Sequence, residues 1–179
     1  VTHYRELSTS SLAERIGNEE LSLCIFYMSA YGSTARMAEA VQAGAEAEPG
    51  VRISLYDLAG GETTPFVDLI EEADAIAFGS PTINGDAVKP VWDLLSSLAV
   101  VNLQGKLGAA FGSFGWSGEA VRMIEDRMRG LKMRVPVAGV RIKLIPTDEE
   151  LDECRDFGHR LALALLGEGM ERVIEMADL

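Results

Sequence analysis

The sequence predicts a doubly wound α/β domain with a five-stranded parallel sheet between two layers of helices. Five short, almost wholly apolar runs alternate along the chain with segments whose apolar residues recur every three or four positions. Strands that are apolar on both faces need cover on both, which is typical of a parallel sheet between helical layers. Right-handed crossovers then connect each strand to the next through one helix.

The expected strands are Leu21–Tyr27, Val51–Asp57, Ala73–Gly79, Lys106–Ser113 and Val135–Leu144. The expected helices are Thr34–Glu48, Pro65–Glu72, Val88–Leu98, Gly118–Leu131 and Asp148–Leu166. In each helical segment charged residues separate the apolar positions, as around Met37, Val41 and Ala45 in the first. We expect residues 1–20 to be a linker or the end of a preceding domain, residues 21–167 to form the α/β domain, and residues 168–179 to be a C-terminal tail. Because the chain begins with Val1 rather than Met, we expect it to be processed or cut from a longer protein.

Composition excludes several classes of function. The 179 residues suit one domain, and 16 Lys and Arg against 28 Asp and Glu give a net charge of −12, which argues against nucleic acid as a partner. No apolar run reaches the ~18–20 residues of a membrane span and no signal-peptide pattern opens the chain, so we expect a cytoplasmic protein without a membrane partner. Two distant cysteines and two histidines argue against a disulfide framework, an iron–sulfur cluster or a multi-histidine metal site.

The loop after the first strand is suited to an anion. In open doubly wound sheets ligands bind beyond the carboxyl ends of the strands. Here Ser29–Thr34 (SAYGST) leads directly into a helix, so hydroxyls, a glycine and a helix N-terminus form a candidate phosphate cradle. It is neither a P-loop nor a G-x-G-x-x-G turn. The alternative is that Ser33 or Thr34 only caps the helix.

Two further loops are expected at the same edge. Gly79–Gly85 (GSPTING) contains Pro81 and Asn84-Gly85, which favour turns and a rigid loop against a flat ligand, or else an ordinary connection. In Phe111–Glu119 (FGSFGWSGE), Trp116 either reaches the core or covers a ligand. Three such loops at one edge, with a phosphate cradle at one end and flat-ligand contacts at the other, indicate a mononucleotide site. The lack of a catalytic acid–base pair within it indicates a redox cofactor.

These residues resemble a flavodoxin domain over roughly Leu21–Leu166. SAYGST, GSPTING and above all FGSFGWSGEAV are most similar to the C-terminal flavodoxin-like domain of flavodiiron proteins, the A-type flavoproteins. The resemblance implies a three-layer sandwich of strand order 2-1-3-4-5 that binds FMN. It implies that Ser29, Tyr31, Gly32, Ser33 and Thr34 hold the phosphate, with Ala30 offering its backbone. It further implies that Pro81, Thr82, Asn84 and Gly85, with Ile83 between them, line the isoalloxazine, and that Ser113, Phe114, Gly115, Trp116 and Gly118 form the opposing wall.

The resemblance also implies a role. Electrons would come from a rubredoxin-like or other redox donor and pass to a diiron O₂ or NO reductase centre. That centre would lie on a metallo-β-lactamase-like domain, typically of the partner subunit in a head-to-tail homodimer. The family's iron-ligand motif HxExD is absent here, so we expect no metal ligands and no catalytic residues on this chain, only an electron-transfer domain of an oxidoreductase. The alternatives are a free-standing flavodoxin carrier, an NAD(P)H:quinone reductase of the same fold, and a receiver-like module, which would need acidic residues where this chain has hydroxyls.

Overall fold

The computed structural model describes residues 20–177, so the expected linker at residues 1–20 lies outside them except for its last residue. The long strands are β1 (Leu21–Tyr27), β2 (Val51–Asp57), β3 (Ala75–Gly79), β6 (Leu107–Phe114) and β7 (Val140–Lys143). The helices are α2 (Ser33–Glu46), α3 (Thr64–Glu72), α4 (Lys89–Ser97), α5 (Glu119–Gly130) and α6 (Asp148–Ala177), with a 3₁₀ turn at Leu98–Val100 after α4. Two short strands, β4 (Thr82–Ile83) and β5 (Asp86–Ala87), complete the sheet.

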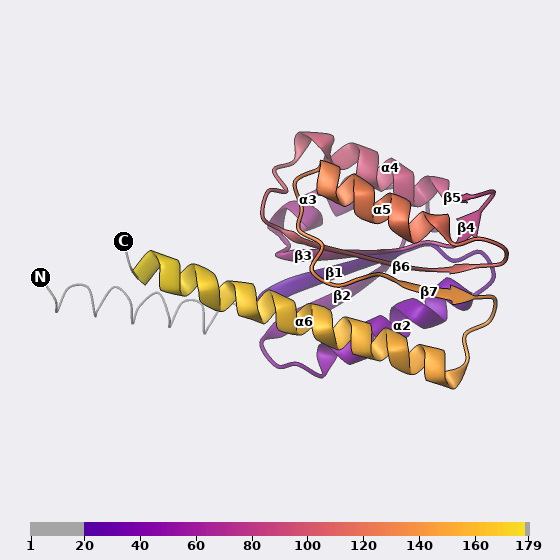
Figure 1. The fold of residues 1–179 in the computed structure, drawn as a ribbon. Coiled ribbons are helices and arrows are strands. Elements are labelled where there is room, and N and C mark those ends of the chain that lie inside the picture. Colours follow the sequence, from indigo (N-terminus) through magenta and orange to yellow (C-terminus); the bar gives the residue numbers. More distant parts are fainter. Residues whose placement is uncertain (1–19, 178–179) are drawn as a thin grey trace, which may run out of the picture.

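The five long strands are all parallel and lie in the order β2-β1-β3-β6-β7, which confirms the predicted order 2-1-3-4-5. Helices α2 and α6 cover one face of the sheet and α3, α4 and α5 cover the other (Figure 1). Among the described residues, no helix combines the length and the apolar composition that crossing a bilayer requires. The parallel arrangement brings all five carboxyl ends to one edge.

Three local features differ from the prediction. The GSPTING loop contains the hairpin β4–β5, whose strands are too short to show a period in the sequence. β7 begins at Val140 instead of Val135, because Pro136 has no N–H to donate to a sheet ladder. Helix α6 continues through residues 168–177, where a separate tail was expected.

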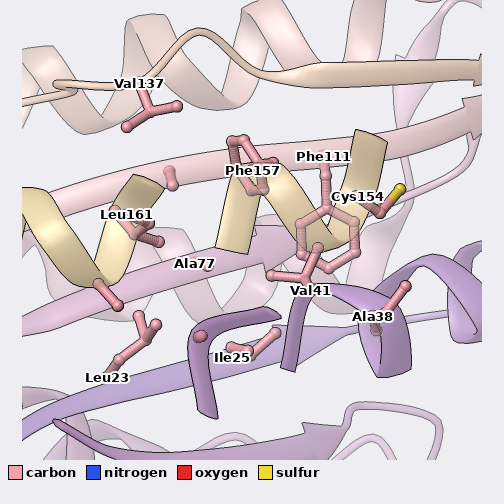
Figure 2. Packing of buried hydrophobic residues seen from close by; sticks show 14 of the residues in the cluster. Leu23, Ile25, Ala38, Val41, Ala77, Phe111, Val137, Cys154, Phe157 and Leu161 are labelled. Carbon is pink, nitrogen blue, oxygen red and sulfur yellow. The ribbon is translucent and has the colours of Figure 1, made fainter. Parts of the chain in front are cut away.

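Helices α2 and α6 pack unusually closely over β1 and β6. Figure 2 shows Val41 of α2 and Phe157 and Leu161 of α6 in one buried cluster with Phe111 of β6. Glycines permit this approach: a Cβ at Gly158 would lie 2.0 Å from the carbonyl oxygen of Val41. Because α2 begins at the carboxyl edge of the sheet, this contact also fixes where its N-terminus lies.

Both cysteines lie within the core and are expected to be unreactive in the folded chain. Burial raises the pKa of Cys24 and raises that of Cys154 to about 12, so both remain thiols at pH 8, where the nucleophilic thiolate is scarce. We expect iodoacetamide to label neither cysteine at pH 8 within the time that labels both in urea, as read by mass spectrometry. Rapid labelling of the folded chain would contradict this packing.

Candidate cofactor-binding site

A cavity of about 500 Å³ opens at the carboxyl edge of the sheet. The loops after β1, β3 and β6 and the segment after β7 enclose it. Its lining residues are Ser29, Ala30, Tyr31, Ser33, Thr34, Pro81, Thr82, Ile83, Ser113, Phe114, Gly115, Leu144 and Ile145. Its volume lies within the ~300–1,000 Å³ usual for small-molecule and cofactor sites. The three loops singled out from the sequence therefore do meet around one space.

One end of the cavity is polar and ends at the N-terminus of α2. The first helical hydrogen bond runs from the N–H of Arg36 to the oxygen of Gly32, so the N–H groups of residues 33–35 have no partner within the helix. No side chain caps this N-terminus. The reading of Ser33 or Thr34 as a simple cap is therefore wrong, and these groups are available to an anion.

Two buried hydroxyls form the floor beneath this polar end. Thr34 Oγ1 and Ser113 Oγ lie 2.9 Å apart and join the first turn of α2 to the end of β6. The Ser29 hydroxyl accepts a hydrogen bond of 3.1 Å from the N–H of Gly32, which holds the loop closed ahead of the helix. Gly32 has φ of 91°, a conformation that a glycine adopts at little cost.

The other end of the cavity is apolar and open. Pro81, Ile83 and Phe114 line it, together with Leu144 and Ile145 after β7. The aromatic Tyr31 in the lining is 96% exposed. Soluble proteins rarely leave such groups uncovered together without a ligand or partner. The arrangement suits a flat, largely apolar ring system.

Five predicted site residues lie outside the lining: Gly32, Asn84, Gly85, Trp116 and Gly118. Trp116 is 95% exposed, so the alternative that it reaches into the core is wrong. Asn84 and Gly85 form the tip of the hairpin with φ of 53° and 73°, which agrees with the turn that this dipeptide favours. Their contact with a cofactor stays a prediction.

The hairpin that carries Pro81 to Gly85 is fixed from two directions. Trp92 Nε1 of α4 donates to Asp86 Oδ1 at 2.7 Å, so Trp92 has a structural role. The N–H of Ala120 at the start of α5 donates to Thr82 Oγ1 at 3.2 Å. One wall of the cavity is thereby tied to two helices.

Sequence reasoning missed Leu144 and Ile145 because it considered only the loops after strands one, three and four. The chain after β7 also leaves at the carboxyl edge, and this position was the available clue. The N–H of Leu144 donates to the oxygen of Phe114 at 2.8 Å, which holds this segment beside the β6 loop. Among residues 20–177, no three His, Cys, Asp or Glu side chains are grouped so as to hold a metal ion.

Comparison with known proteins agrees with this geometry. The flavodoxin family model matches residues 25–158. The chain belongs to the flavodoxin family. A solved flavodoxin from the domain Archaea is 36% identical to it and superposes with a TM-score of 0.74, over 81% of this chain and 99% of that one. Flavodoxin domains bind FMN, as the sequence resemblance implied.

Longer flavoproteins contain a segment similar to this flavodoxin domain. The type A flavoprotein fprA of Rhodobacter capsulatus is 56% identical over the whole chain, which spans 41% of that protein's length. The metal-soaked flavodiiron core of Flv1 from Synechocystis sp. PCC6803 is 30% identical with a TM-score of 0.78, over 92% of this chain and 41% of that one. The predicted resemblance to the flavodoxin-like domain of flavodiiron proteins is confirmed.

Proposed function

We propose that this flavodoxin domain holds FMN in the cavity at the carboxyl edge and passes electrons from a rubredoxin-like or other redox donor to a diiron O₂ or NO reductase centre on another domain or subunit. The observation that carries the first part is a cavity that joins an uncapped helix N-terminus to an apolar, open end. The two ends match the phosphate and the ring system of FMN in chemistry.

Different residues of the chain bind the phosphate and the ring system of FMN. The free N–H groups at the start of α2 and the hydroxyls of Ser29 and Ser33 hold the phosphate dianion, helped by the positive end of the helix dipole. The Thr34–Ser113 pair keeps the floor in place. Apolar side chains around Ile83 and Ile145 exclude water from the ring. When bound, FMN supplies one- and two-electron chemistry, and the protein adjusts it through nearby hydrogen bonds and charge.

The similarity to longer flavoproteins supports the second part of the proposal. The chain covers about two fifths of the R. capsulatus type A flavoprotein at 56% identity, so a larger part of that protein lies outside the match. We propose that the diiron domain is that larger part in the parent protein, and that a head-to-tail homodimer brings it near the FMN. A free-standing carrier is the second candidate, because this chain also covers 99% of the archaeal flavodoxin.

An absorption spectrum of the purified chain tests the cofactor. We expect the visible bands of an oxidised flavin, one FMN released per chain on denaturation, and loss of the bands when dithionite delivers two electrons per chain. A colourless protein that also fails to take up added FMN would overturn the proposed function.

A further inference from the structure

Basic residues are concentrated in one stretch of an otherwise acidic chain. Residues 119–143 hold seven of the 16 Lys and Arg residues but three of the 28 Asp and Glu residues, so this stretch carries +4 whereas the whole chain carries −12. All seven basic residues are exposed: Arg122, Arg127, Arg129, Lys132, Arg134, Arg141 and Lys143. Such charge separation on a surface creates a local positive potential.

Helix α5 and strand β7 place three of these arginines around one hollow of about 370 Å³, which Arg122, Arg129 and Arg141 line. We call this surface the arginine face. Its two acidic residues are engaged, because Glu125 Oε1 accepts from the N–H of Gly139 at 2.9 Å and Asp126 pairs with Arg129 at 3.3 Å. Within residues 20–177, neither Arg122 nor Arg141 takes part in an ion pair.

The arginine face adjoins the cofactor cavity through both of its elements, because β7 and α5 are each connected directly to a segment at the cavity. Along β7, Arg141 and Lys143 are exposed on either side of the buried Ile142, and the next two residues line the cavity. Helix α5 begins immediately after the loop that follows Phe114 and carries Trp116. A protein seated on this face would therefore contact the open end of the cavity.

A purely structural role explains only some of the basic residues at the arginine face. Charged residues on an edge strand hinder pairing with another chain, and β7 is such a strand, so Arg141 and Lys143 serve that purpose at least. Arg122 and Arg129 lie on a helix, where no strand edge needs protection. Protection of the strand edge therefore does not explain why arginines of both α5 and β7 line the same hollow.

We propose that the arginine face docks an acidic electron-carrier protein next to the cofactor, an inference that rests on the FMN-binding role proposed above. The donor would be a carrier with one redox-active iron, such as a rubredoxin. Each encounter would oxidise that iron from Fe²⁺ to Fe³⁺ and supply one electron to the FMN, so two donors would be consumed per fully reduced flavin, with protons taken from water. An acidic carrier is attracted to this face and repelled by the rest of the chain, which fixes its orientation.

Matched charge reversals test the docking. The flavin-loaded chain is mixed in a stopped-flow instrument with a reduced rubredoxin of acidic isoelectric point, at several ionic strengths. The variants are Arg122→Glu and Arg141→Glu, and the control is Arg52→Glu, which changes another exposed arginine, on β2 at the opposite edge of the sheet. Dithionite, a small reductant that needs no docking surface, serves as the second electron source.

We expect each arginine-face variant to lower the second-order rate constant with rubredoxin about fivefold at low ionic strength, an effect that salt removes. Arg52→Glu is expected to leave this rate constant within about 1.5-fold of the wild-type value, since it alters the net charge by the same amount but leaves the arginine face unchanged. Equal slowing by Arg52→Glu, or no slowing by either variant, overturns the docking proposal while reduction by dithionite still supports the proposed function. A chain that binds no flavin or is not reduced by dithionite overturns the proposed function itself, and the docking proposal with it.

Discussion

Gly158→Ala is expected to lower the free energy of unfolding by about 3 kcal/mol, near the upper end of the usual cost of overpacking a core. The added Cβ would lie 2.0 Å from the carbonyl oxygen of Val41, and a Cβ at Gly44 on the facing helix would lie 1.8 Å from that of Arg155. Both contacts are with backbone atoms, which cannot rotate away, so α2 and α6 must separate. Urea unfolding followed by circular dichroism measures the loss.

Gly167→Ala is the matched control in the same helix. Gly167 is exposed and a Cβ there has no atom within 4 Å, so only the helix propensity changes. We expect this substitution to raise stability by up to about 1 kcal/mol. Equal stabilities of the two variants would mean that α2 and α6 do not cross as closely as described.

The double variant Ser29→Ala/Ser33→Ala is expected to weaken FMN binding about 100-fold. Each hydroxyl donates to a phosphate dianion in the proposed site, and a hydrogen bond to a charged group contributes at least about 1.5 kcal/mol, or roughly tenfold in affinity. Riboflavin has the same ring system without the phosphate, so its weaker binding is expected to stay within about twofold of wild type. Titration of flavin fluorescence gives the dissociation constants of FMN and of riboflavin.

A serine far from the cavity provides the control for this pair. Ser96 is exposed on α4, and Ser96→Ala is expected to leave both affinities unchanged. If the double variant weakened riboflavin as much as FMN, the two serines would act on the ring or on the loop as a whole. The assignment of the polar end to the phosphate would then be wrong.

The strand positions and the three site loops could be predicted from local chemistry, whereas the strand order was implied by the resemblance to a known family. Apolar runs indicate the buried strands, and hydroxyls ahead of a helix indicate a candidate anion site wherever the helix lies. Leu21–Tyr27 and Val51–Asp57 match the structure to the residue for this reason. The positive φ of Asn84 and Gly85 likewise follows from the residues themselves.

What could not be predicted depends on contacts between distant segments. Leu144 and Ile145 look like the end of a strand, and only the register of β7 on β6 places them in the cavity wall. The exposure of Trp116 is likewise set by how the loop leaves β6, because its glycine neighbours allow many directions. The sequence places Thr34 and Ser113 at the same edge of the sheet, but only the fold brings their hydroxyls to 2.9 Å from each other.

Amide NMR during FMN titration tests the central claim most directly, because it shows whether FMN binds in the cofactor cavity or in one of two other hollows on the surface. The structure also has a hollow of about 490 Å³ at the opposite end of the strands, lined by Asp74 and Arg134 among others, and the one at the arginine face. We expect the largest shift changes at the amides of residues 33–35, with further changes around Thr82, Gly115 and Ile145, saturating at one FMN per chain. Changes centred on either of the other hollows, with the start of α2 unaffected, would contradict the account.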